Sequence, residues 1–381
     1  MNHFVINKKE KELLRLLFLE RVCSESEDIA FLLKGADFDN ERFEYLLMLA
    51  VLGKKQDWRY FPNEIKPRLE GIYKSVRLRN IYGVPWLKEK LLLLNKHAVP
   101  LMLLKGMAMR AYYAPETPRQ MSDYDFAVPE ERFKEAKDIL MESDSTLQPG
   151  PVSQHALHIE KQGKVIDLHQ WIFKTHGGVS AGLWENSIEI AFLGAGVRVL
   201  NPVDIFIHIV DCKTRDLIKN IQSDRKLKWL FDTRCIIKKA GYENWDWSKV
   251  ADRAKELGSY NYVVYLMPYF SEVFPDTLSE ADMRYFFPQD EEYQDWYKRV
   301  KKVSLVNEEF QAYIKNHCED KFAWRRRLKA LWRDWNHYHY YYGQELKAAG
   351  EKIGFFNYFC SVHRIKGITG LFKRVFVKLF H

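Results

Sequence analysis

The chain has 381 residues, 47% of them hydrophobic, and its 59 basic and 51 acidic residues give a formal net charge of +8. This length allows two or three domains, and the apolar content excludes a wholly disordered chain. No stretch approaches the ~20 uninterrupted apolar residues of a membrane span, and the first residues lack a signal-peptide pattern. The five cysteines are scattered and never form a Cys-x-x-Cys pair, which argues against a disulfide framework or a zinc site. We therefore expect a cytoplasmic protein that favours anionic partners such as nucleotides, nucleic acid or lipid headgroups.

Helical periodicity dominates both ends of the chain, and strand patterns lie between them. Apolar residues recur at helical spacing from residue 9 to about 95. The chain is helical again beyond residue 201, with Asn201 as a cap and Pro202 as the first helical position. Between these regions, the pattern predicts strands at 101–104, 122–128, 155–161, 164–171 and 197–200, and helices at 107–113 and 129–142.

This order predicts an α+β protein with a small core between helical segments. We expect four regions: an N-terminal helical region at 1–96, an α/β core at 97–200, a helical domain at 201–300, and a basic, aromatic-rich helical region at 301–381.

Two aspartates in the 122–128 stretch are the main chemical signal. Side chains on a strand alternate between faces, so we expect Asp123 and Asp125 on one face, with Tyr124 and Phe126 in the core. Paired carboxylates repel each other unless a cation lies between them. Mg²⁺ suits such a site because it takes few carboxylates and completes its shell with water and substrate phosphates. The alternative interpretation is a polar strand edge or turn.

A third carboxylate, Asp167, lies in another alternating stretch that places it on the same face as His169. If residues 162–163 form a two-residue hairpin loop, His158 lies opposite Asp167 and contacts it. A two-metal site needs such a carboxylate to help hold the metal that activates the attacking hydroxyl. The alternative is a cross-strand His–Asp pair without a ligand. His158 and His169 are accessory candidates for acceptor binding; the alternative is that both have only a structural role.

Gly106 marks a candidate phosphate-binding turn, because it follows a predicted strand end and precedes a predicted helix start. Glycine allows close approach of phosphate to the backbone, and helix N-terminal amides attract anions. Lys105 and Arg119 add positive charge just before the aspartates, where triphosphate oxygens would lie. The alternatives are an ordinary strand-to-helix turn and two solvated surface cations.

The order and spacing of these segments carry a family resemblance over about residues 95–235. The matching pieces are Leu104-Lys105-Gly106, Tyr112-Tyr113, Arg119, the 122–128 run, the 165–169 run and, more weakly, 227–232. In this arrangement the chain resembles the uncharacterised bacterial nucleotidyltransferase family of the polymerase β-like superfamily.

The resemblance implies a mixed-sheet nucleotidyltransferase core that moves a nucleoside monophosphate from a triphosphate to a hydroxyl acceptor, releasing pyrophosphate. It implies two Mg²⁺ ions, for which Mn²⁺ can substitute. Met107 stands where the wider superfamily usually has Ser, which leaves phosphate binding to backbone amides and cations. The implied metal-binding catalytic residues are Asp123, Asp125 and Asp167, and the implied nucleotide-binding residues are Lys105, Gly106, Met107, Arg119 and Ser122.

Two alternatives to this function stay open at the level of sequence. One is a degenerate, non-catalytic nucleotide-binding or scaffold module. The other is a metal-dependent nucleotide-sugar glycosyltransferase, although its large N-terminal nucleotide-binding unit has no counterpart here. The acceptor is open among small molecules, glycans and proteins, and nucleic acid is not excluded.

Two further patterns have more than one interpretation. Asp204, His208 and Asp211 form one stripe on the helix after Pro202, either a polar seam between helices or a ligand face. Residues 352–381 contain basic residues, no acid and an apolar helical face. That segment either packs on the protein or makes peripheral contact with the inner face of a membrane.

Overall fold

The computed structural model describes part of the chain in detail. It divides the chain into two compact units, Met1–Tyr297 and Lys298–His381, and the second lies outside the described residues. The predictions for Ser122, 301–381 and 352–381 therefore also lie outside them. No helix among the described residues is both long and apolar enough to cross a bilayer. The described residues are 6–18, 26–34, 43–114, 117–121, 123–144, 146–152, 156–161, 163–173, 180–218, 227–286 and 293–294.

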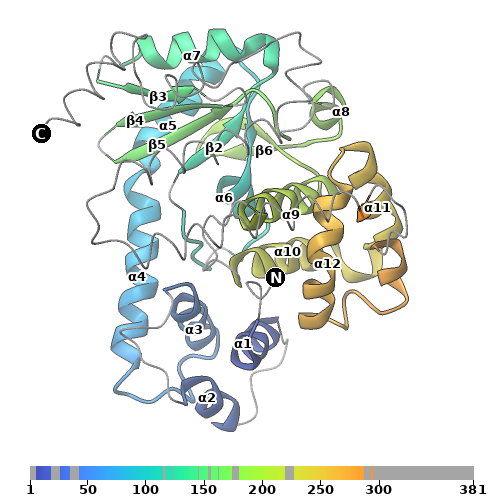
Figure 1. The fold of residues 1–381 in the computed structure, drawn as a ribbon. Coiled ribbons are helices and arrows are strands. Elements are labelled where there is room, and N and C mark those ends of the chain that lie inside the picture. The colour runs from blue at the N-terminus through green and yellow to red at the C-terminus, as the bar shows by residue number, and fades with distance from the viewer. Residues whose placement is uncertain are drawn as a thin grey trace, which may run out of the picture. The chain divides into compact units, whose positions relative to one another are not determined.

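Within the described part of the first unit, seven strands form one mixed sheet in the order β3-β4-β5-β2-β1-β7-β6 (Figure 1). β2 runs parallel to β5 and β1 parallel to β7, whereas the other neighbours are antiparallel. The combination of this sheet with helices before and after it confirms the α+β prediction. The strands are β1 (Met102–Leu103), β2 (Tyr124–Ala127), β3 (Gln148–Val152), β4 (Ala156–Lys161), β5 (Lys164–His169), β6 (Ile188–Phe192) and β7 (Ala195–Val199).

The two edge strands, β3 and β6, were not predicted from the sequence. β3 contains Pro149, Gly150 and Pro151, residue types that are depleted in strands but tolerated at an edge, where one row of backbone groups needs no partner. β6 is largely exposed, so no buried apolar run marks it. The predicted strands of the sheet centre are confirmed as β1, β2, β4, β5 and β7.

Helices precede the sheet and cover it. The long helices α4 and α5 meet at Gly83, and α5 packs against both α7 and β7. The short helices α6 and η1 follow β1, and η2 lies between β2 and α7. These elements are α1 (Lys8–Phe18), α2 (Ser26–Leu33), α3 (Phe43–Lys55), α4 (Lys66–Tyr82), α5 (Val84–Lys96), α6 (Lys105–Ala108), η1 (Met109–Ala111), η2 (Glu130–Arg132), α7 (Phe133–Glu142) and α8 (Ser180–Glu185).

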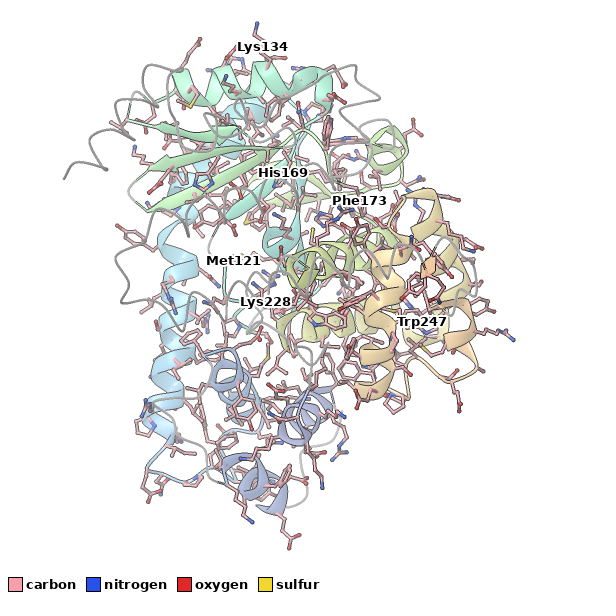
Figure 2. The ribbon with its side chains drawn as sticks, viewed as in Figure 1. Met121, Lys134, His169, Phe173, Lys228 and Trp247 are labelled. Carbon is pink, nitrogen blue, oxygen red and sulfur yellow. The ribbon has the colours of Figure 1, made fainter. Side chains whose placement is uncertain are left out.

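A second set of helices follows the sheet. The first of them begins at Pro202 as predicted, and Asn201 caps it because its Oδ1 accepts a hydrogen bond of 2.9 Å from the Asp204 amide. Trp247 lies in the aromatic core of this set (Figure 2), with its ring 5.5 Å from Phe206 and 5.8 Å from Phe270. The elements are α9 (Pro202–Ile218), α10 (Leu227–Ala240), η4 (Tyr242–Asn244), α11 (Trp247–Glu256), α12 (Tyr260–Val273) and η5 (Asp282–Phe286).

Glu44 connects the N-terminal helices to α10. Its carboxylate, which is buried, accepts hydrogen bonds from the amides of Leu227 (3.0 Å) and Lys228 (2.8 Å) at the start of α10. These amides have no partner within the helix, and a carboxylate also complements the positive end of the helix dipole. Glu44 therefore fixes the first turn of a helix whose next residues line the candidate site.

We expect Gly83→Ala to destabilise the protein, because an added Cβ would lie 1.5 Å from Tyr124 Oη and 2.6 Å from Tyr124 Cζ. The Tyr124 ring is packed near Trp86, so the overlap should lower the free energy of unfolding by about 1–3 kcal/mol. Gly71→Ala is the matched control within α4: nothing lies within 4 Å of its Cβ, and helix propensity should raise stability by up to ~1 kcal/mol. Urea unfolding followed by circular dichroism measures both, and equal effects would contradict the packing of Tyr124 on Gly83.

Candidate active site

The parallel pairing of β2 with β5 brings two carboxylates together. In this register Asp125 lies beside Asp167, while their neighbours Phe126 and Leu168 are buried in the core. Ligand atoms of Asp125, Asp167 and His169 all lie within 4.8 Å of one another. The alternation expected from the sequence thus places two acids and one imidazole where a single cation could contact all three.

The predicted hairpin between β4 and β5 is confirmed. Lys161 pairs with Lys164 and His158 with Asp167, and Gly163 at the turn has a φ of 74°, a conformation that favours glycine. His158 Nδ1 lies 2.8 Å from Asp167 Oδ1. His158 therefore orients the Asp167 carboxylate from the adjacent strand.

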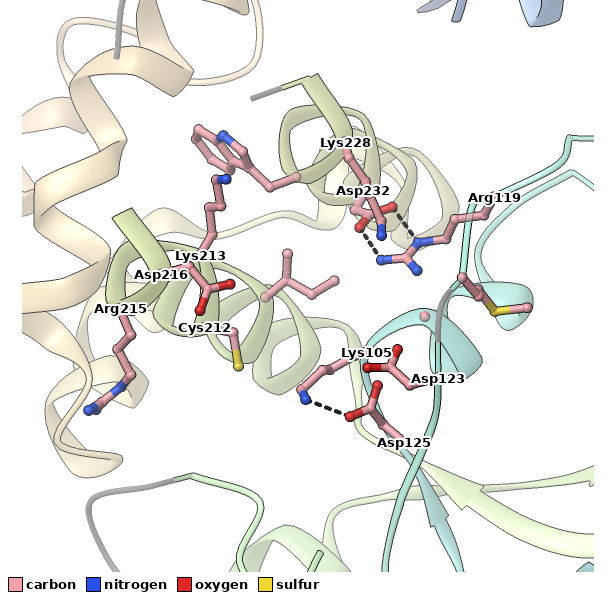
Figure 3. Close-up of a pocket in the computed structure, with 14 residues that line it drawn as sticks. Lys105, Arg119, Asp123, Asp125, Cys212, Lys213, Arg215, Asp216, Lys228 and Asp232 are labelled. Carbon is pink, nitrogen blue, oxygen red and sulfur yellow. Dashed lines mark hydrogen bonds and ion pairs between the residues drawn. The ribbon is translucent and has the colours of Figure 1, made fainter. Parts of the chain in front are cut away.

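Lys105 lies beside Asp125 at the start of α6. Its φ of 43° is a left-handed conformation that costs a non-glycine residue roughly 1–2 kcal/mol. The Nζ atom lies 2.5 Å from Asp125 Oδ1 (Figure 3). Burial raises the pKa of Asp125, but the Lys105 ammonium and the hydrogen bond with His169 outweigh burial and hold that pKa well below its usual range. Lys105 therefore neutralises a buried carboxylate in this structure.

His169 completes the surroundings of Asp125. Its Nε2 lies 3.1 Å from Asp125 Oδ1, and the side chain is buried. Burial lowers the pKa of His169, the hydrogen bond with Asp125 raises it, and the nearby Lys105 ammonium lowers it again; the net shift is downward. A neutral imidazole can act as a metal ligand, so His169 belongs to the candidate site itself rather than to its margin.

Arg119 is fixed by Asp232 of α10. Arg119 Nε lies 3.0 Å from Asp232 Oδ1 and Nη2 lies 2.7 Å from Oδ2, a bidentate geometry (Figure 3). Tyr113 Oη also donates to Asp232. The guanidinium lies against Gly106, where an added Cβ would be 2.4 Å from Arg119 Nη1. We expected phosphate to approach the backbone closely at Gly106; in this structure the Arg119 guanidinium occupies that position.

A cavity of about 250 Å³ lies between the sheet and helices α9 and α10 (Figure 3). Asp167, His158 and His169 are not among its lining residues; they lie next to it, where Asp167 and His169 adjoin Asp125. The predicted residues that line it are Lys105, Gly106, Arg119, Asp123 and Asp125. Asp123 lies just before β2 and faces the cavity, but it is outside the group of three that could share one ion.

Met107, one of the predicted nucleotide-binding residues, is not among the residues that line the cavity. Its side chain is buried in the core, and its amide donates to the Leu104 carbonyl at 3.0 Å.

The helical wall of the cavity carries charged residues that were not singled out from the sequence. α9 contributes Lys213, Arg215 and Asp216, and α10 contributes Lys228 and Asp232. Arg215 is bound by Asp211 with a distance of 2.7 Å between Nε and Oδ2. The weak resemblance at 227–232 was the available signal for α10, whereas charges on α9 resemble those of any solvated helix.

The stripe formed by Asp204, His208 and Asp211 on α9 contains residues that contact other elements. Asp204 pairs with Arg253 of α11 at 2.7 Å, and the His208 ring packs edge-on against Phe173 at 5.4 Å. The interpretation as a polar seam is therefore confirmed for Asp204. His208 is fully buried, and its Nδ1 has no hydrogen-bond partner among the described residues.

Residues 45–275, more than half of the chain, match the model of a family described as uncharacterised nucleotidyltransferase. The chain therefore belongs to this nucleotidyltransferase family, as its motifs predicted. A comparison with curated protein sequences finds no match.

Among solved structures the chain is similar to the solution structure of the antibiotic-resistance factor ANT(2'')-Ia, with 17% identity over 43% of this chain and 87% of that chain and a TM-score of 0.34. It is similar to the crystal structure of ANT(2'')-Ia in complex with adenylyl-2''-tobramycin, with 17% identity, coverage of 47% and 98%, and a TM-score of 0.35. A third likeness is to an antigenic nucleotidyltransferase-like protein from Paracoccidioides brasiliensis, with 14% identity, coverage of 50% and 90%, and a TM-score of 0.32.

We expect Asp232→Asn to destabilise the protein by about 3 kcal/mol, because it leaves the buried Arg119 guanidinium without a compensating charge. Asp252→Asn is the matched control: it removes a carboxylate whose pair with Lys255 is exposed, and should cost less than ~1 kcal/mol. Urea unfolding of both variants gives the comparison. Similar losses in the two variants would show that the Arg119–Asp232 pair contributes no more than a surface pair.

We also expect the buried His208 to make the protein sensitive to acid. Burial and, secondarily, the Lys105 ammonium lower the pKa of His208 to about 4. The unfolded chain binds this proton near pH 6.5 but the folded chain only near pH 4, so the free energy of unfolding falls, by up to about 3 kcal/mol, as the pH drops through this window. His208→Gln should reduce the fall, whereas His97→Gln, at an exposed histidine, should not. Urea midpoints at pH 7 and pH 4.5 test this, and parallel pH dependence of wild type and His208→Gln would contradict it.

Proposed function

We propose that the chain transfers a nucleoside monophosphate from a nucleoside triphosphate to a hydroxyl acceptor, with release of pyrophosphate and dependence on a divalent metal. The observation that carries this proposal is the gathering of carboxylates and cationic side chains around one cavity. Asp123 and Asp125 lie on the sheet side beside Lys105, and Lys213 and Lys228 lie on the helical side together with Asp216 and Asp232. Such a mixed lining matches a substrate whose phosphates need both metal ions and cationic side chains.

The carboxylates at and beside this cavity fit a divalent metal. Asp125 and Asp167 offer carboxylate oxygens, the donors that Mg²⁺ and Mn²⁺ prefer, and His169 adds an imidazole nitrogen. Asp123 would hold a second ion together with Asp125. Metal ions bound there would supply charge stabilisation for the entering and leaving oxygens of an in-line displacement.

Lys105 would have two roles, first as the partner of Asp125 and then as a phosphate contact. Without a metal its ammonium balances the charge of Asp125 at 2.5 Å. With a cation held by Asp125, the Lys105 ammonium would be free to contact a phosphate oxygen of the triphosphate. Lys105 lines the cavity and is therefore within reach of such a phosphate.

The helical wall would bind the leaving part of the substrate. Lys213 and Lys228 lie on α9 and α10, across the cavity from the carboxylates (Figure 3). Their ammonium groups would stabilise the charge that develops on the pyrophosphate as the bond to the α-phosphate breaks. Arg119 would contribute positive potential from its fixed position beside Gly106.

The acceptor hydroxyl would approach Asp167. This carboxylate is fixed by His158 on one side and lies next to Asp125 on the other, and it would receive the proton of the attacking hydroxyl. The cavity of about 250 Å³ is smaller than most ligand sites, which supports a role in holding the phosphates rather than the whole acceptor. We propose a small molecule, a glycan or a protein side chain as acceptor.

Family membership favours nucleoside triphosphates over nucleotide sugars as donors. The non-catalytic module is the remaining alternative, and it differs from the proposed enzyme in one observable: it would bind a triphosphate without releasing pyrophosphate.

We expect Asp125→Asn and Asp167→Asn to lower pyrophosphate release from the preferred triphosphate by at least about 10²–10³-fold, because each removes a charge at the reacting centre. The assay follows pyrophosphate with ATP, GTP, CTP and UTP, with and without Mg²⁺ or Mn²⁺, with water as the acceptor. Asp252→Asn, which removes an exposed carboxylate, should retain wild-type activity.

Thermal unfolding of each variant provides the folding control. A metal-dependent stabilisation by one triphosphate, without turnover in wild type, would support the non-catalytic module. Turnover that persists in a folded Asp125→Asn protein would overturn the proposed roles of the carboxylates.

A further inference from the structure

A second cavity, of about 700 Å³, lies among α1, α3, α4, α10 and the residues that follow α6. Its size is within the range of small-molecule sites, about 300–1,000 Å³. None of the residues assigned to the proposed transfer reaction lines it.

Aromatic side chains form the floor of this cavity. The Phe231 ring lies 5.0 Å from the ring of Phe18 and 5.2 Å from that of Tyr113, and Tyr73 is buried beside them. Such a surface favours an apolar body, since removing it from water gains roughly 25 cal/mol per Å².

Lysines form the rim. Lys54 and Lys55 end α3, and Lys238 and Lys239 end α10. The described residues that line the cavity include no carboxylate. The C-terminal ends of the two helices carry a partial negative charge of roughly −0.5 each, about −1 together. The four lysine ammonium groups carry about four times as much positive charge, so the rim is positive.

One of these lysines has a structural partner. Lys55 Nζ donates to the Leu17 carbonyl at 2.8 Å and so caps α1. Lys54, Lys238 and Lys239 have no hydrogen bond or ion pair with any described residue. The rim therefore has three exposed cations available for an anion.

Helix α10 separates this cavity from the candidate active site. Lys228 and Asp232 face the active site, whereas Phe231 and Lys238 face the second cavity. Tyr113 lines the second cavity and donates to Asp232, which holds Arg119 on the other side. A molecule in the second cavity would thus be a different ligand from the nucleotide, separated from the metal-binding carboxylates by α10.

We propose that the second cavity is a binding site for an amphipathic organic phosphate, with its apolar body on the aromatic floor and its phosphate at the lysine rim. A phosphate monoester carries a charge of about −1.5 to −2 at neutral pH, which matches several clustered ammonium groups better than a single carboxylate does. The site does not depend on the proposed transfer reaction, because no residue is shared between them.

Isothermal titration of the full chain with farnesyl monophosphate, below its micellar concentration, tests this proposal. Farnesol and inorganic phosphate serve as half-ligands, and each should bind at least about tenfold more weakly than farnesyl monophosphate. Lys54→Gln/Lys238→Gln removes one cation from each helix end and should weaken binding at least about tenfold.

The matched control is Lys96→Gln/Lys134→Gln, which removes two exposed helical lysines outside the cavity and should leave binding unchanged. Circular dichroism establishes that both double variants are folded. No binding of farnesyl monophosphate, or equal binding by both variants, would overturn the proposal.

Cysteine labelling locates the bound molecule independently of any substitution. Cys235 lines the second cavity and Cys212 lines the candidate active site. Burial raises the pKa of the Cys235 thiol and slows its reaction, so labelling is followed over hours at about pH 8.5 or above. Farnesyl monophosphate should slow N-ethylmaleimide modification of Cys235 further, measured by peptide mass spectrometry, and leave the rate at Cys212 unchanged. Slower labelling at Cys212 alone would place the phosphate in the active site and refute a second site.

Discussion

The buried charge of Asp125 is the constraint on which the candidate site depends. A carboxylate that is 2% exposed cannot remain ionised in a folded protein without partners, because removing an ion from water costs several kcal/mol. Lys105 supplies the compensating ammonium and His169 the hydrogen bond. Because these partners come from α6 and β5, satisfying one carboxylate fixes the end of β1, the start of β2 and the end of β5 relative to one another. The left-handed backbone at Lys105 is the local cost, and the ion pair offsets it.

Helix α10 connects this centre to the rest of the first unit. Its first turn is capped by Glu44 from the N-terminal helices. Further along the helix, Asp232 forms the bidentate contact with Arg119. Tyr113 adds a hydrogen bond to the same carboxylate. The helix consequently contributes to the helical wall of the candidate active site on one side and to the aromatic floor of the second cavity on the other.

Local pattern was sufficient to predict the strand positions of Asp125 and Asp167, and insufficient to predict the charged residues of the helical wall. Strand alternation and a two-residue loop determine that Asp167 lies opposite His158, and both follow from the sequence within a few residues. Asp125 and Asp167 are neighbours only because β2 pairs in parallel with β5, a strand that does not follow it directly along the chain. The partner of Arg119 lies 113 residues away, and no periodicity specifies which face of which helix will meet it. Edge strands such as β3 escape detection because their proline and glycine content is permitted only by position in the sheet.

The charge pattern of the candidate active site has a consequence for the order of binding in the proposed reaction. Lys105, Arg119 and Arg215 are each neutralised by an aspartate in this structure. A metal at Asp125 would compete with the Lys105 ammonium, and a triphosphate that contacted Lys105 would leave Asp125 unpaired. A triphosphate and a divalent metal bound together would avoid both penalties, because Asp125 would hold the metal while the Lys105 ammonium contacted a phosphate oxygen. The Lys105–Asp125 ion pair would therefore favour joint binding of metal and nucleotide over binding of either one separately.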